Sequence, residues 1–265
     1  MYLIAEPFWI QKSGCSEAEF EDAFWPEKSI DGPTERRFAV ADGATETSFS
    51  SIWAKQLVRC YCRGELDQEH DFEQTLRQLQ IKWNQIVRRK PLPWYAEQKL
   101  ESGTYATLLG LTMHDASQNS SAGEWHAIAS GDTCLIQMRG DRVITTFPIT
   151  SSEEFTNQPI LLSTNLDANI NALKAMCKTS GHWEPGDTFY VMTDALAAWF
   201  FREFEVGCSP WRILRDLSAE PSQNDRSDKR FAPLRLFRDW IHELRADSAL
   251  KNDDVTLYRI EIQKI

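Results

Sequence analysis

Three aspartates stand where apolar segments of the chain begin or end. Asp42 and Asp194 each follow a run of apolar residues, and Asp253 precedes one. In an antiparallel sheet the end of one strand and the start of its neighbour lie at the same edge, so these carboxylates can converge. Gly43, directly after Asp42, allows a sharp turn and lets a ligand approach its carbonyl closely.

Carboxylates that converge in this way repel one another. Each close pair costs on the order of several kcal/mol at an effective dielectric constant near 20. A hard divalent cation removes that cost, and oxygen ligands without histidine or cysteine favour Mg²⁺ or Mn²⁺ over zinc. The sequence therefore predicts a divalent metal site formed by Asp42, Asp194 and Asp253.

Each candidate also has a simpler interpretation. Asp42 before a glycine is most often a tight turn, and Asp194 can cap the helix that follows it. Asp253 and its acidic neighbour can form a turn before the last strand, and Asp132 can be a hairpin residue. Glu21 and Asp22 can be solvated acids at the exposed end of a strand. Only the joint occurrence favours a site.

The apolar patterns predict an α+β fold. We expect strands at 2–10, 20–25, 38–42, 104–113, 125–129, 135–138, 142–147, 188–194 and 255–262. We expect helices at 47–63, 72–87 (ended by Pro91 and Pro93), 195–204, 211–217 and 231–244, and a loop with one short helix at 168–176 in the segment 151–181.

The predicted strands are apolar on both faces and connect through hairpins. Such strands need cover on both sides, so two antiparallel sheets stacked together with helices outside satisfy the pattern. We see no internal repeat or linker and expect one domain over 1–265. Its aromatic segment at 199–247 is interpreted as a helical insertion that forms a layer, with a lid or partner surface as alternatives.

Composition excludes some function classes. With 29 Lys and Arg against 39 Asp and Glu, the net charge of −10 argues against binding to nucleic acid or anionic membranes. The six cysteines lack zinc-ligand spacing and are predicted to be reduced, mostly buried thiols. The first residues lack a signal-peptide pattern, so we expect a cytoplasmic protein.

The ordered set of short motifs resembles that of a known family. The motifs are Glu21-Asp22-Ala23, Val40-Ala41-Asp42-Gly43, Gly103-Thr104-Tyr105-Ala106-Thr107, Gly131-Asp132-Thr133, Thr193-Asp194-Ala195 and Asp253-Asp254-Val255-Thr256. In this order they resemble the metal-dependent (PPM, type 2C) protein serine/threonine phosphatases over nearly the whole chain. Asp-Gly-Ala-Thr-Glu at 42–46 is similar to the divergent bacterial branch.

The resemblance implies a four-layer α-β-β-α sandwich with two Mn²⁺ or Mg²⁺ ions at one edge and a third, weaker ion. The catalytic residues would be Asp42, Asp194 and Asp253. Asp42 would bridge the two ions, Asp194 and Asp253 would hold one of them, and Asp132 with Asp194 would hold the third. The metal ligands it implies are Glu21, Asp22, Asp42, Gly43, Asp132, Asp194 and Asp253. The implied activity is hydrolysis of phosphoserine and phosphothreonine through in-line attack by a hydroxide that bridges the metals.

The resemblance also implies partners. The substrate would be a phosphorylated protein, a cognate serine/threonine kinase is a candidate partner, and we expect a monomer that contacts neither nucleic acid nor membrane.

Four positions depart from the family pattern. The phosphate-binding arginine that often precedes the Glu-Asp pair is absent from 16–18, and the histidine of some relatives is Ala44. Ala195 replaces a glycine, and Asp254 replaces an asparagine. These changes leave open a pseudophosphatase that binds a phosphoprotein or kinase without turnover. A metal-dependent hydrolase of small phosphoesters is a third, weaker hypothesis.

Overall fold

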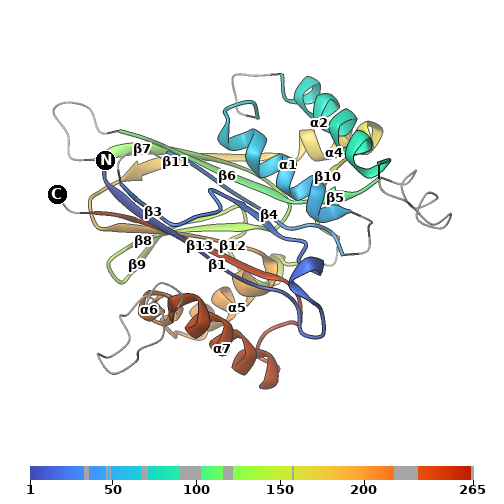
Figure 1. The fold of residues 1–265 in the computed structure, drawn as a ribbon. Helices are drawn as coiled ribbons and strands as arrows, with labels where there is room; N and C mark the ends of the chain where they lie inside the picture. Colours follow the sequence, from blue (N-terminus) through green and yellow to red (C-terminus); the bar gives the residue numbers. More distant parts are fainter. Residues whose placement is uncertain are drawn as a thin grey trace.

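The computed structural model describes residues 1–32, 36–45, 47, 49–66, 71–89, 103–115, 122–156, 158–217 and 232–263. Figure 1 shows two sheets stacked face to face, with one helical layer above them and another below. This confirms the predicted α+β sandwich of four α-β-β-α layers. Glu46, Pro91, Pro93 and Phe231, which the sequence predictions used, lie outside the described residues.

The first sheet has six strands, each antiparallel to its neighbours. In spatial order they are β3 (Ile30–Gly32), β1 (Leu3–Ile10), β13 (Val255–Ile262), β12 (Asp187–Met192), β8 (Cys134–Arg139) and β9 (Arg142–Phe147). The first and last strands of the chain, β1 and β13, pair along their whole length. The apolar run before Asp194 is β12 and the run after Asp253 is β13, and these two strands are neighbours in the sheet.

The second sheet has five strands, also antiparallel. In spatial order they are β11 (Cys177–Trp183), β7 (Gly123–Ser130), β6 (Leu108–His114), β4 (Arg37–Ala41) and β2 (Ala23–Trp25). A separate two-stranded ladder joins β5 (Tyr105–Ala106) to β10 (Leu162–Ser163).

Large apolar side chains from both sheets fill the space between them. The Trp125 and Phe189 rings lie 5.7 Å apart edge to face, and Tyr258 packs on Phe38 with ring centroids 5.6 Å apart. Ring pairs of this kind add to the stabilisation from burial, which is about 2 kcal/mol for each such side chain. This core holds the two sheets in fixed register, so residues at their ends occupy defined positions.

Helices cover the two outer faces (Figure 1). α1 (Ser50–Cys62), α2 (Phe72–Val87) and α4 (Asn169–Lys174) pack on the five-stranded sheet. α5 (Asp194–Glu205), α6 (Pro210–Asp216) and α7 (Ala232–Ala246) pack on the six-stranded one. One-turn 3₁₀ helices occur at Glu17–Glu19, Ser152–Glu154 and Leu166–Ala168. The described part of the predicted insertion at 199–247 is thus a helical layer, while the single-domain organisation remains a prediction.

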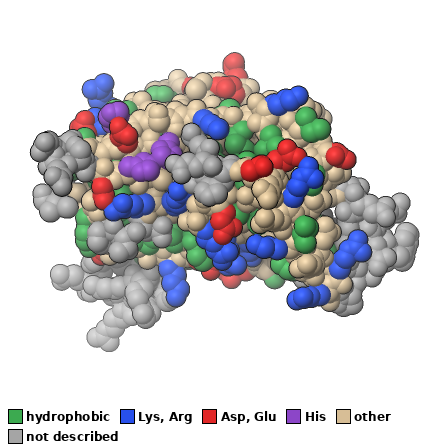
Figure 2. Space-filling model, turned by 90° about the horizontal axis from the view of Figure 1, so that it is seen from above, with side chains coloured by type: hydrophobic (Ala, Val, Ile, Leu, Met, Phe, Trp, Pro, Cys, Tyr) green, Lys and Arg blue, Asp and Glu red, His purple; other side chains and the backbone are tan. Residues whose placement is uncertain are grey.

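The surface seen from above mixes the two signs of charge. Acidic and basic side chains lie close to one another over much of this face (Figure 2). Opposite charges interspersed in this way attenuate each other's field. Among the described residues, no helix has both the length and the apolar character needed to cross a membrane.

Three of the predicted elements were wrong. The strand predicted at 20–25 begins only at Ala23, because residues 17–19 form a 3₁₀ turn and the acidic pair follows it. The strand at 104–113 is broken at Thr107, whose backbone N–H is used elsewhere. The loop at 151–181 contains β11, an edge strand whose exposed polar residues give no apolar signal. The six cysteines form no disulfide in the described part of the chain, and only Cys60 and Cys134 are buried, so the prediction of mostly buried thiols was wrong.

Candidate active site

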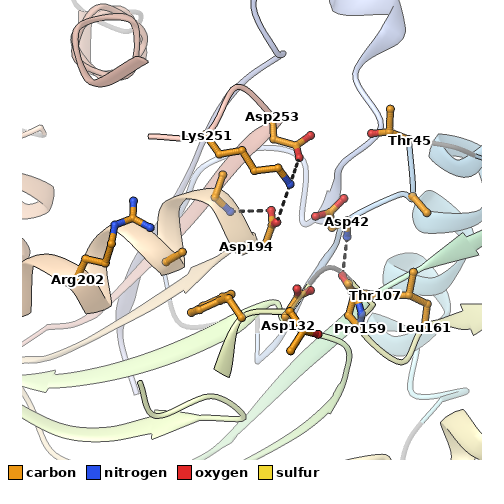
Figure 3. A pocket seen from close by; sticks show the side chains of 15 residues that line it. Asp42, Thr45, Thr107, Asp132, Pro159, Leu161, Asp194, Arg202, Lys251 and Asp253 are labelled. Atoms are coloured by element: carbon orange, nitrogen blue, oxygen red, sulfur yellow. Dashed lines mark hydrogen bonds and ion pairs between the residues drawn. The ribbon is translucent and has the colours of Figure 1, made fainter. Parts of the chain in front are cut away.

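Four of the predicted aspartates line one cleft at an end of the sandwich. The cleft has a volume of about 420 Å³, and Asp42, Asp132, Asp194 and Asp253 contribute to its lining. Asp42 comes from the end of the five-stranded sheet, whereas Asp194 and Asp253 come from the end of β12 and the start of β13 in the other sheet. Figure 3 shows these carboxylates facing a common space. The structure thus brings these four aspartates together from both sheets.

Thr107 fixes the backbone of Asp42. The Asp42 N–H donates to Thr107 Oγ1 at 2.7 Å, and the Thr107 N–H donates to the Asp42 carbonyl at 2.8 Å. Thr107 Oγ1 also lies 2.6 Å from Thr133 Oγ1. Burial, followed by the charges of Asp22 and Asp194, raises the pKa of the Asp42 carboxyl well above its usual range. A carboxylate held so rigidly in repulsive surroundings favours a bound cation.

Gly43 is required by the close approach of Glu21. A Cβ at position 43 would lie 2.7 Å from the Glu21 carbonyl oxygen, which is closer than non-bonded atoms pack. The Glu21 carboxylate itself accepts a hydrogen bond from Ser50 Oγ at 2.6 Å and lies 3.5 Å from Lys12 Nζ. The glycine thus brings the first acidic motif against the second, although the two are far apart in sequence.

Asp22 is buried beside the cleft and is only partly satisfied. Its Oδ2 accepts hydrogen bonds from Thr193 Oγ1 at 3.1 Å and Thr256 Oγ1 at 2.8 Å. Its Oδ1 is buried without a hydrogen-bond partner in the described part of the chain. Burial and the neighbouring charge of Asp254 raise the pKa of Asp22 well above the ordinary value. An unpartnered buried carboxylate oxygen is the kind of donor that a cation satisfies.

Asp194 and Asp253 share one ammonium group. Lys251 Nζ lies 2.7 Å from Asp253 Oδ2 and 3.5 Å from Asp194 Oδ2 (Figure 3). Asp194 is the first residue of α5, and its Oδ1 accepts the Ala195 N–H at 2.6 Å. The N-cap position belongs to Thr193, so Asp194 contributes one oxygen to the helix start and keeps the other for the cleft. Burial raises the pKa of Asp194, and Lys251 opposes that rise.

Asp132 lies on the opposite wall of the cleft from this ion pair (Figure 3). It is buried, and burial together with the charge of Asp194 raises the pKa of its carboxyl to about 7. Gly131 before it has φ +93°, and a Cβ there would lie 2.6 Å from Thr107 Cγ2. The glycine therefore lets the Asp132 turn pack against the residue that fixes Asp42.

Asp254 has a role that the sequence did not reveal. Its carboxylate accepts the Lys12 N–H at 2.8 Å and the Glu21 N–H at 2.7 Å. The acidic residue in place of the family's asparagine therefore fastens the N-terminal loop to the start of β13. The contacts of Thr107 and Thr193 were likewise missed, because their partners lie far away in the sequence. Lys251 was missed although Asp253 is only two residues away, because its second partner, Asp194, lies on a distant element.

The donor set fits a hard divalent cation. All the candidate ligands are oxygen atoms, several carboxylates are buried close together, and Asp22 has an unpartnered oxygen. With the side chains as they stand, no three His, Cys, Asp or Glu residues of the described ranges are gathered tightly enough to hold an ion. Cation binding would therefore require side-chain rotations that draw the carboxylates inward.

Comparisons with known proteins agree with the predicted fold. A family model described as protein phosphatase 2C matches residues 19–248. The photosystem II phosphatase PBCP superposes with a TM-score of 0.60 at 16% identity, over 99% of this chain and 100% of that one. The serine/threonine phosphatase PstP/Ppp of Mycobacterium tuberculosis gives 0.58 at 14% identity, over 100% of both chains.

A structure of the PstP catalytic domain in complex with two manganese ions is also similar. It gives a TM-score of 0.54 at 15% identity, over 99% of this chain and 100% of that one. At these identities the likeness to solved structures shows the fold. No curated protein sequence matches the chain.

Proposed function

This chain belongs to the protein phosphatase 2C family, and from that premise we propose that it hydrolyses phosphoserine and phosphothreonine in proteins with Mn²⁺ or Mg²⁺ as cofactor. The observation that carries the proposal is the meeting of Asp42, Asp132, Asp194 and Asp253 in one cleft. The family match covers most of the chain, including Asp42, Asp132 and Asp194. A metal-binding role is therefore better supported for them than it would be for isolated acidic turns.

The residues that would hold two core ions and a third, weaker ion are Glu21, Asp22, Asp42, Gly43, Asp132, Asp194 and Asp253. Two bound divalent cations lower the pKa of water and stabilise the charge of the phosphoryl oxygens during in-line displacement. The chain contributes the rigid placement of Asp42 through Thr107 and the bridging of the two sheet ends.

Two positively charged side chains line the same cleft. Arg202 and Lys251 lie on its α5 and β13 side and can attract the dianionic phosphate of a substrate. Phe155, Pro159 and Leu161 form an apolar part of the lining on which a substrate chain can pack. These groups replace, in part, the phosphate-binding arginine that is absent from 16–18.

Hydrolysis of p-nitrophenyl phosphate tests the proposal. We expect turnover only with added Mn²⁺ or Mg²⁺, and a loss of at least about 100-fold in Asp42→Asn, because a carboxylate that would hold the metal is removed. Asp141→Asn is a matched control, since Asp141 is exposed and pairs with Arg212 and Arg215. Turnover without metal, or undiminished turnover in Asp42→Asn, would reject the site.

A pseudophosphatase is the alternative that one observation favours. Lys251 already offsets part of the negative charge of two candidate metal ligands, Asp194 and Asp253, which weakens the attraction of the cleft for cations. A module of this kind would bind a phosphopeptide in calorimetric titration and release no phosphate.

Comparing phosphopeptides with nucleotides and sugar phosphates as substrates would separate a protein phosphatase from a hydrolase of small phosphoesters. A kinase partner, a monomer and a cytoplasmic location remain predictions.

A further inference from the structure

Lys251 lies between two carboxylates of the cleft, those of Asp194 and Asp253. Its ammonium nitrogen lies 2.7 Å from Asp253 Oδ2 and 3.5 Å from Asp194 Oδ2, so one cation joins the start of β13 to the start of α5. The side chain is 66% exposed, whereas Asp194 and Asp253 are 21% and 24% exposed. The lysine therefore reaches in from solvent to carboxylates that the fold has partly dehydrated.

The other cation of the cleft has a different arrangement. Arg202 Nη2 donates to the Ala249 carbonyl at 2.9 Å, and Figure 3 shows its guanidinium apart from the four aspartates. Two positive side chains thus line one cleft, but within the described ranges it is Lys251 that forms ion pairs with its aspartates. Arg202 and Lys251 carry the same charge, and they differ in how close that charge lies to the carboxylates.

An ammonium and a divalent cation cannot share these oxygens. A Mg²⁺ or Mn²⁺ ion bound to Asp253 Oδ2 would sit about 2.1 Å from that oxygen and hence within about 5 Å of Lys251 Nζ if the lysine stayed in place. Repulsion between charges of +2 and +1 at that separation weakens binding on the order of tenfold even in water. The exposed lysine side chain can leave without disturbing the core.

We propose that Lys251 is a built-in counter-cation of the metal site. Its ammonium stabilises Asp194 and Asp253 while no metal is bound, and it must be displaced before a divalent cation can bind both carboxylates. The residue thereby sets a high threshold of metal concentration for loading the site. This inference rests on the proposed function, because it concerns the metal affinity of the same cleft.

Calorimetric titration of the metal-free full chain with Mn²⁺ tests the proposal without any activity measurement. We expect Lys251→Met to lower the dissociation constant for Mn²⁺ about tenfold, because the competing charge is gone while the aliphatic length remains. Lys251→Arg retains the charge and should stay within about threefold of the wild type. Arg202→Met removes a cation from the same cleft and should change the constant less than about threefold, because that charge lies farther from the ligands.

The melting temperature of the metal-free protein is an independent readout. It should fall in Lys251→Met, because Asp194 and Asp253 then face each other uncompensated, and added Mn²⁺ should restore it. If the wild type and Lys251→Met bind Mn²⁺ equally, or if the variant binds more weakly, the counter-cation role is overturned while the proposed function stands. If neither protein binds Mn²⁺, both this inference and the metal-dependent function are overturned.

Discussion

The two ends of β12 place an aspartate in opposite electrostatic surroundings. Asp187, at the start of the strand, is fully buried and accepts hydrogen bonds from Arg139 Nε at 2.8 Å and Arg139 Nη2 at 2.9 Å. Gln137 Nε2 adds a third bond at 2.8 Å, and the Glu184 N–H adds a fourth at 3.0 Å. Asp194, directly beyond the other end, shares one exposed lysine with Asp253 and faces Asp42 and Asp132 across a cleft.

The difference separates a structural carboxylate, Asp187, from one that we propose to be functional, Asp194. At the Asp187 end the fold supplies a bidentate guanidinium, so the charge is neutralised within the chain. At the Asp194 end neither Asp42 nor Asp132 has an ion pair in the described part of the chain, and their raised pKa values record the cost. Stability is given up there, which is typical of sites that acquire their counter-charge from a ligand.

Substitution of the structural carboxylate should have the largest effect on stability. In Asp187→Asn the guanidinium of Arg139 loses its buried charged partner and keeps the exposed Glu184, and we expect the free energy of unfolding to fall by about 2–3 kcal/mol. Urea denaturation followed by tryptophan fluorescence measures this change. Mn²⁺ affinity should stay within about twofold of the wild type, since the cleft lies at the other end of the strand. A fall in the free energy of unfolding of less than about 1 kcal/mol would mean that the ion pair of Asp187 with Arg139 does not stabilise the fold.

Replacing an aspartate by asparagine at the cleft end should have the opposite effect on the free energy of unfolding. In metal-free Asp132→Asn a repulsive charge disappears, so we expect the free energy of unfolding at pH 8 to rise by about 1–2 kcal/mol. Addition of saturating Mn²⁺ should then stabilise the variant less than it stabilises the wild type. Destabilisation of the metal-free variant would abolish the contrast between the two ends.

The contrast was only partly predictable from the sequence. The ends of strands are visible as apolar runs that stop at Asp42 and Asp194, and the last strand is visible as the apolar run that follows Asp253. These signals are local, and they located three of the four aspartates in the cleft, whereas Asp132 was added by the family resemblance. The family resemblance, confirmed by the match to protein phosphatase 2C, supplied the order in which the motifs assemble.

The supporting contacts were invisible for a physical reason. Asp22 receives its hydrogen bonds from residues 171 and 234 positions later, and Asp254 bonds to backbone groups more than 230 positions earlier. Hydrogen bonds at such separations leave no periodic pattern in the chain. The same holds for the break at Thr107, which exists because its N–H and hydroxyl both bond to Asp42 rather than to a neighbouring strand.

The smallest expected effect is a pH dependence confined to the metal-free protein. The pKa of Asp132 rises to about 7 in the folded state from an ordinary value of 3.8, so the folded chain binds more protons than the unfolded chain between those pH values. Stability must therefore fall as pH increases through this window, and we expect the free energy of unfolding to decrease by about 1 kcal/mol between pH 5.5 and pH 8. The trend should be nearly absent in Asp132→Asn, and weaker with saturating Mn²⁺, because a bound cation then stabilises the ionised carboxylates. Melting curves at matched ionic strength measure it, and an Asp132→Asn slope equal to that of the wild type would assign the dependence to other groups.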